Sequence, residues 1–282
     1  MPRYLRHISA SALQFGINQA AGLGLFYLLS RGLDKDHFGE LNWSLAVSFT
    51  MINLLGMGLD QLAVKKIAEG APDGKILSLY RRHVLISGAL FYGILLTCWA
   101  CFPRFFQTHY FLAGIALAKT ILFFSMPYKQ LAAGKERFGI LMSMSIVSNV
   151  IKLGAVGACF LLDTWSVGIV IGIYIAGDIF EWIASTILGL RLLEMPGVRT
   201  TLRAWRDLMR ESLPLAGVVL FSTAMARFDW IFIGLFVSAA KLAEYSFAYK
   251  GFEVASLPLQ ALAPLLLPAF ARRLGATPRI RG

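Results

Sequence analysis

The chain has 282 residues, of which 57% are hydrophobic and 15% are charged, and its mean hydropathy is +0.65. Soluble domains carry about 25% charged residues, so this composition excludes an ordinary soluble domain and favours a membrane protein. The formal net charge is +11, but no soluble basic domain remains to bind nucleic acid, and no nucleic-acid partner is expected.

Eight apolar segments are long enough to cross a bilayer, which takes about 20 helical residues. They cover residues 8–29, 43–64, 84–102, 109–128, 139–162, 165–190, 212–237 and 247–270. The first follows basic residues, as in a signal peptide, but it is too long for one, carries Gln14 and Asn18, and lacks a convincing cleavage site. The sequence therefore predicts an all-α, polytopic membrane protein of about eight transmembrane helices.

Lysine and arginine are distributed unevenly among the loops between these segments. With the N-terminus placed in the cytoplasm, 19 of them lie in cytoplasmic segments and four, Arg31, Lys35, Arg104 and Lys241, lie in outer ones. Cytoplasmic loops of membrane proteins carry an excess of these residues. We therefore expect a multi-pass protein with both termini in the cytoplasm.

Four bases lie inside the apolar segments: Lys119, Lys152, Arg227 and Lys250. A charge at the bilayer centre costs roughly 2.5–3.5 kcal/mol, and such residues usually face a bundle interior or a water-filled cavity. The sequence therefore predicts a cationic, substrate-binding cavity formed by these side chains. For Lys119 and Lys152 the alternative is a structural ion pair across the bundle, because neither has an acid within a turn of its own helix.

Arg227 has two interpretations. Near mid-bilayer its planar guanidinium suits a phosphate, because it donates two parallel hydrogen bonds. The alternative is a structural pair with Asp178 or Glu181. Asp229 is two residues away and points to a different side of the helix, so the two side chains do not simply neutralise each other.

Acidic side chains occupy the same segments: Asp178, Glu181, Asp229 and Glu253. Glu253 lies three residues after Lys250 on one helix face, so we expect these two to pair. Asp178 and Glu181 are also three apart and would repel each other, so either a base lies opposite or one of them is protonated. The acids are therefore candidates either for ion pairs or for coupling transport to protons or cations.

The first segment carries Gln14 and Asn18, four residues apart on one helix face. They predict either hydrogen bonds to a neighbouring helix or contacts with sugar hydroxyls.

Residue types used in catalysis form no recognisable constellation. Cys98 and Cys101 have the spacing of a metal or redox pair, but no second ligand pair lies nearby, and the four histidines are scattered over loops and span ends. No glycine-rich nucleotide-binding loop is present. The sequence therefore predicts neither an enzyme nor a cofactor or metal site.

Residues 24–68 and 230–273 show the same order of features: a span, a short outer turn, an aromatic-rich second span and a pair of bases. The offset of about 205 residues corresponds to six spans, so both copies point the same way, as in transporters built from parallel repeats. We therefore expect a six-helix lobe over residues 1–195, a cytoplasmic linker over 196–211, and the start of a second, truncated lobe over 212–282.

Several short motifs resemble the bacterial polysaccharide (O-antigen type) flippases, a family within the superfamily of multidrug exporters and lipid II flippases. They are Phe38-Gly39, Gly58-Leu59-Asp60, Leu213-Pro214, Arg227-Phe-Asp229, Tyr245-Ser-Phe-Ala248 and Pro268. The resemblance implies two six-helix lobes around a central cavity. It also implies transport of undecaprenyl-pyrophosphate-linked oligosaccharide across the bacterial inner membrane. This transport would serve the biosynthesis of cell-surface polysaccharides such as the O-antigen of lipopolysaccharide.

The implied partners are the lipid-linked oligosaccharide, membrane lipids and, as a further option, other polysaccharide-assembly proteins. Family members have two complete lobes, whereas only two helices of the second lobe are predicted here. An inactive truncated remnant or a membrane scaffold is therefore an alternative function. A multidrug cation exporter is a further alternative, although the first span contains no acid to bind a cation.

Overall fold

The computed structural model describes residues 2–193 and 200–256, and it describes side chains from Gly16 onward except at position 17. Within these residues the chain is helical and contains no strand, in agreement with the predicted all-α fold. The helices are α1 (Pro2–Gly32), α2 (Lys35–Gly56), α3 (Leu59–Ala68), α4 (Asp73–Cys101), α5 (Pro103–Thr108), α6 (Leu112–Phe123), α7 (Met126–Gly134), α8 (Phe138–Leu162), α9 (Val167–Leu190) and α10 (Leu202–Phe236). A last helical segment covers residues 239–256.

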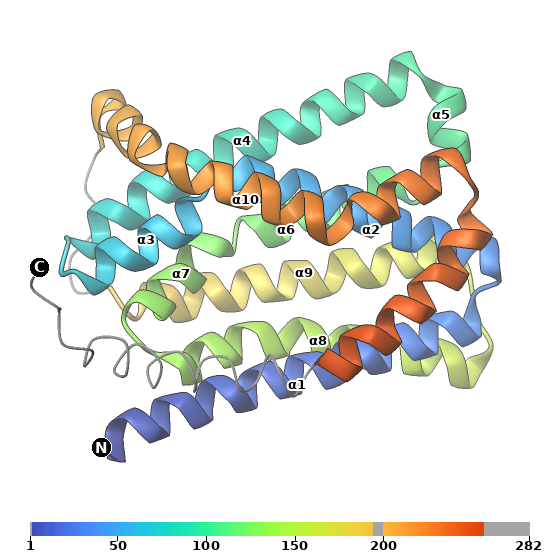
Figure 1. Cartoon of the computed structure of the whole chain (residues 1–282), viewed down its shortest axis with the longest axis horizontal. Helices are drawn as coiled ribbons and strands as arrows, with labels where there is room; N and C mark the ends of the chain where they lie inside the picture. Colours follow the sequence, from blue (N-terminus) through green and yellow to red (C-terminus); the bar gives the residue numbers. More distant parts are fainter. Residues whose placement is uncertain (1, 194–199, 257–282) are drawn as a thin grey trace, which may run out of the picture.

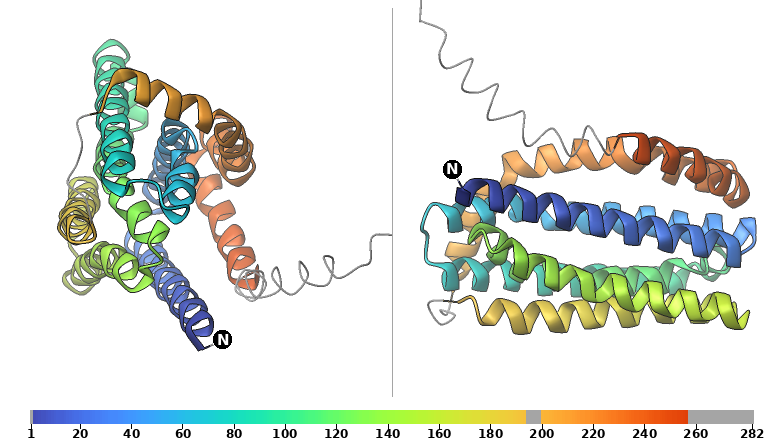
Figure 2. Two further views of the ribbon diagram at one scale, coloured as in Figure 1. Left: turned by 90° about the vertical axis from the view of Figure 1, so that its left-hand side faces the viewer. Right: turned by 90° about the horizontal axis from the view of Figure 1, so that it is seen from below.

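The long helices lie roughly along one direction and form an elongated bundle (Figure 1). α8 packs against α1 and α9, α9 packs against α6, and α10 packs against α2. The side-by-side arrangement of α1, α8 and α9 is visible in Figure 2. One end of the bundle carries α3 and α7, and the other carries α5 and the α1–α2 turn. We call the latter the outer end, because the distribution of Lys and Arg among the loops predicts that it faces away from the cytoplasm.

Among the described residues four helices, α4, α8, α9 and α10, are long and apolar enough to cross a membrane by themselves. The pair α2 and α3 together makes a fifth candidate. The described residues therefore form a polytopic helical membrane fold, as predicted. The predicted first span lies in α1, and the predicted eighth begins in the segment 239–256 and continues outside the described residues, as does Pro268.

Two predicted spans are broken rather than continuous. The second bends by 48° between α2 and α3, because Met57 and Gly58 both adopt left-handed backbone angles (φ 48° and 72°). The fourth is divided into α6 and α7 by Phe124 and Ser125. Pro127 follows at the start of α7 and has no N–H to donate to the carbonyl four residues earlier.

The segment predicted as a linker is partly helical. α10 begins at Leu202 and continues without interruption past Pro214 to Phe236. Thr201 caps its N-terminus, because its hydroxyl accepts a hydrogen bond from the N–H of Ala204. The part of the linker from 202 onward is therefore continuous with the following span, and the division into two lobes stays a prediction.

Gly39 lies where α2 meets the start of the segment 239–256. A Cβ at this position would lie 1.8 Å from the carbonyl oxygen of Ala239, which is backbone and cannot rotate away. We expect Gly39→Ala to lower the free energy of unfolding by about 1–3 kcal/mol, as overpacking does, and thermal unfolding in detergent would measure the loss. Gly154→Ala is the matched control, because nothing lies within 4 Å of the added methyl group. Equal midpoints for the two variants would contradict the close approach.

Candidate functional site

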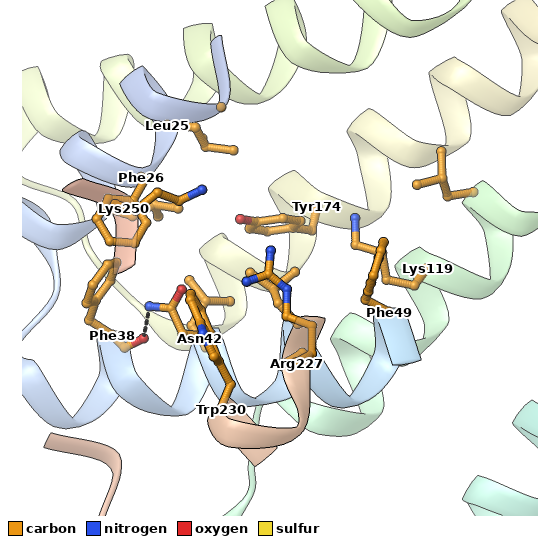
Figure 3. Close-up of a pocket in the computed structure, with 16 residues that line it drawn as sticks. Leu25, Phe26, Phe38, Asn42, Phe49, Lys119, Tyr174, Arg227, Trp230 and Lys250 are labelled. Atoms are coloured by element: carbon orange, nitrogen blue, oxygen red, sulfur yellow. Dashed lines mark hydrogen bonds between the residues drawn. The ribbon is translucent and has the colours of Figure 1, made fainter. Parts of the chain in front are cut away.

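A cavity of about 280 Å³ lies within the bundle, and Figure 3 shows its lining. Its walls come from α1, α2, α6, α9, α10 and the segment 239–256. Most lining residues are apolar, including Leu25, Phe26, Phe38 and Phe49, and three are basic: Lys119, Arg227 and Lys250. None of the described residues that line this cavity is acidic.

Two lysines share one carboxylate at the α6–α8–α9 wall. Lys119 Nζ lies 3.0 Å from Asp178 Oδ2, and Lys152 pairs with Oδ1 of the same side chain. Ser148 Oγ donates the third hydrogen bond of this carboxylate, to Oδ1 over 3.3 Å. Both ammonium groups lie 5.2 Å from the centre of the Tyr174 ring, whose face attracts cations. Asp178 is completely buried. The cluster consists of two basic side chains and one acidic side chain, so it has one excess positive charge.

A second cluster of the same stoichiometry lies on α10 and the segment 239–256. Arg227 Nη2 lies 3.6 Å from Glu253 Oε1, and Lys250 pairs with the other carboxylate oxygen. The guanidinium of Arg227 also stacks on Trp230, 4.6 Å from the ring centre, and on Tyr249 at 5.6 Å. Here too, two bases share one acid.

Donor groups beside this cavity lack acceptors. Among the described residues, Nη1 of Arg227 and Nε1 of Trp230 are buried without a hydrogen-bond partner. A buried donor without a partner costs free energy, which an incoming acceptor would recover. Together the two clusters contain four bases and two acids, so the site favours an anion that accepts hydrogen bonds, as phosphates do.

A comparison with known protein families decides the identity of the chain. The model of the family described as polysaccharide biosynthesis protein matches residues 4–273. The chain belongs to this polysaccharide biosynthesis protein family. This membership and the apolar helices indicate a membrane protein associated with polysaccharide biosynthesis.

A solved structure, of a chain named protein A, is similar in fold. The TM-score is 0.63 at 13% sequence identity, over 94% of the present chain and 65% of protein A. At this identity the likeness shows the fold alone. The chain thus spans about 65% of the length of that structure. In a comparison with curated proteins, none matches the present chain.

The four bases singled out from the sequence all lie in these two clusters. Lys119 combines both alternatives, because it pairs with Asp178 and also lines the cavity, whereas Lys152 forms a buried pair and is absent from the lining. Arg227 pairs with Glu253 rather than with Asp178 or Glu181. The predicted pair of Lys250 and Glu253 is present.

The other two predicted acids have partners that the sequence did not suggest. Glu181 pairs with Lys129 of α7, and both side chains are largely buried. Lys129 directly follows the predicted fourth span, so the sequence places it among the 19 cytoplasmic bases and not inside the bundle. Asp229 Oδ2 accepts a hydrogen bond of 2.5 Å from the hydroxyl of Tyr245, whereas Arg227 pairs with Glu253, so the two neighbours have different partners on the segment 239–256.

The polar residues of the first span have separate outcomes. Asn149 Nδ2 of α8 donates a hydrogen bond of 2.8 Å to Asn18 Oδ1, which is the interhelical contact that one of the two interpretations predicted. The side chain of Gln14 lies outside the described residues.

A buried pair near the outer end was not foreseen. His109 Nδ1 lies 3.1 Å from Glu40 Oε1, and the imidazole stacks on Trp43 with 4.0 Å between ring centres. The two residues are 69 positions apart, so only the fold reveals their contact. Among the described residues, no group of three His, Cys, Asp or Glu side chains has the arrangement of a metal site.

Proposed function

We propose that the chain moves a lipid-linked oligosaccharide with an anionic diphosphate head, of the undecaprenyl-pyrophosphate type, across the bacterial inner membrane. In this proposal both termini face the cytoplasm, and the substrate passes from the inner to the outer leaflet. The carried group keeps its covalent structure, so the proposal requires neither a catalytic residue nor a cofactor.

The observation that carries the proposal is the cationic wall of the cavity. Lys119, Arg227 and Lys250 line it without an acid among the described lining residues. The acids behind them, Asp178 and Glu253, are each shared by two bases. The excess of two positive charges matches the charge of a diphosphate diester.

The physical barrier to such transport is the passage of charge and sugar hydroxyls through hydrocarbon. An ion in a medium of low dielectric constant loses its hydration, at a cost of several kcal/mol even after relaxation. Preplaced cations and unpartnered donors replace that hydration. The lipid tail can stay in the bilayer while the head group occupies the bundle interior.

A cation exporter fits the same cavity poorly. Its carboxylates would have to attract a cationic drug, but Asp178 and Glu253 are already compensated by lysine and arginine. The remaining positive charge repels a further cation. The flippase hypothesis is therefore the one that the site favours.

Transport in reconstituted vesicles tests the proposal. The purified chain is placed in liposomes with a fluorescent polyprenyl-diphosphate-linked saccharide, and an impermeant quencher reports its distribution between leaflets. We expect faster exchange between leaflets than in empty liposomes, and no acceleration for the same saccharide linked to an uncharged polyprenyl chain. Exchange at the rate of empty liposomes would contradict the proposal and favour a scaffold or an inactive remnant.

A further inference from the structure

We propose that Phe26, Phe38 and Phe247 form an aromatic plug that closes the outer end of the cavity and separates to release the transported head group. This inference rests on the proposed function. It also adds a specific moving part, which can be tested without any transport measurement.

The three rings come from three different helices and contact one another. Phe26 of α1 lies 5.0 Å from Phe38 of α2 and 5.2 Å from Phe247 of the segment 239–256, measured between ring centres. Phe38 and Phe247 lie 5.8 Å apart. The first two pairs are edge-to-face, an arrangement that aromatic rings favour. The three rings therefore make one apolar cluster.

The plug lies between two cavities. Phe26 and Phe38 line the main cavity, at the end away from Lys119 in Figure 3. Phe38 and Phe247 also line a smaller cavity of about 150 Å³, whose other walls include Leu33, Lys35 and Glu244. Since Phe38 belongs to both linings, the ring cluster lies between the cationic cavity and the smaller one.

An ion cluster spans the outer side of the plug. Lys35 Nζ lies 3.4 Å from Glu244 Oε1, and Lys241 Nζ lies 2.9 Å from Oε2 of the same carboxylate. The pKa of Glu244 is lowered, chiefly by the hydrogen bond from Lys241, so this carboxylate remains charged at neutral pH. Exposed ion pairs of this kind are weak, which suits a contact that must open.

The arrangement of the plug explains how it could open. Two of its rings belong to α1 and α2, whereas Phe247 belongs to the helical segment that follows α10. The rings have no polar atoms, so their separation breaks no hydrogen bond between them. A shift of the segment 239–256 away from α1 and α2 would part the rings and join the two cavities.

A cysteine inside the cavity reports whether the plug is closed. Ala46 is buried and lines the main cavity, so Ala46→Cys places a thiol there with little added volume. The three native cysteines, Cys98, Cys101 and Cys159, are first replaced by serine or alanine. The rate of labelling by an impermeant maleimide is then measured from the outer side in spheroplasts and from the other side in inside-out vesicles.

Phe247→Ala is the variant of choice, because this ring is about half exposed and its loss should leave the fold intact. We expect labelling from the outer side to accelerate about tenfold, which corresponds to about 1.4 kcal/mol less closing free energy, with little change from the other side. Phe228→Ala is the matched control, since Phe228 is an exposed phenylalanine of α10 outside the plug. Lys35→Glu should also accelerate outer labelling, by reversing one charge of the ion cluster.

Outer labelling of Phe247→Ala at the rate of the Phe228→Ala control would overturn the plug. Equal acceleration from both sides would also overturn it, because that result indicates a generally loosened bundle. If the parent chain fails to move lipid in liposomes while Phe247→Ala still accelerates outer labelling, the plug stands and the transport proposal falls.

Discussion

Asp178→Asn should lower the free energy of unfolding by about 3–5 kcal/mol, the usual cost of removing one partner from a buried ion pair. The carboxylate is completely buried and balances both Lys119 and Lys152. Its loss leaves two ammonium groups without their anion inside the bundle. Thermal or denaturant unfolding of the purified protein in detergent would measure the change.

The matched control is Asp207→Asn, because Asp207 is an exposed acid near the start of α10. We expect it to change stability by less than about 0.5 kcal/mol, as surface substitutions usually do. Adding Lys152→Met to Asp178→Asn should recover part of the lost stability, because it removes one of the two buried ammonium groups that have lost their carboxylate. Lys152 does not line the cavity, so its replacement leaves the lining unchanged. An Asp178→Asn variant as stable as the parent would show that this cluster is not essential to the fold.

Arg227→Gln should reduce transport of the diphosphate lipid by at least about 30-fold, because losing a desolvated charge contact typically costs about 2–5 kcal/mol. The same change should have a small effect on folding, since Glu253 retains Lys250 as its partner. Leaflet exchange in liposomes and thermal unfolding in detergent, measured on one preparation, would separate the two effects.

Arg206→Gln on the same helix is the control for Arg227→Gln, because Arg206 is exposed near the start of α10. Arg227→Lys should retain an intermediate rate, since lysine keeps the charge but not the planar fork that binds two oxygens at once. If Arg227→Gln transports as fast as the Arg206→Gln control, Arg227 has no role in binding the head group.

The contrast between the two clusters shows which parts of the site were predictable. Lys250 and Glu253 are three residues apart, and helix geometry alone places them on one face, so their pair was expected and is present. Lys119 and Asp178 are 59 positions apart. Their contact depends on how α6 and α9 are rotated and offset against each other, which no local pattern encodes.

The helix breaks were missed for a related reason. Hydropathy is averaged over a window of residues, so a single turn of altered backbone inside an apolar stretch does not change the averaged value. Gly58 and Pro127 were visible in the sequence as residues that permit a break. Whether a span bends there depends on the packing around it, and Gly58 adjoins Leu215 of α10 too closely for a side chain.

The sequence by itself determined the class of protein: long apolar segments, the uneven loop charges and four bases within the spans indicate a polytopic helical membrane protein with a charged interior. These features follow from transfer free energies, which depend on residue type and segment length. The tertiary structure alone decided the partners: Asp178 shared by two lysines, Glu253 by Lys250 and Arg227, and three phenylalanine rings in contact near one end. Such contacts depend on distances between helices far apart in the chain, and only the packed bundle defines those distances.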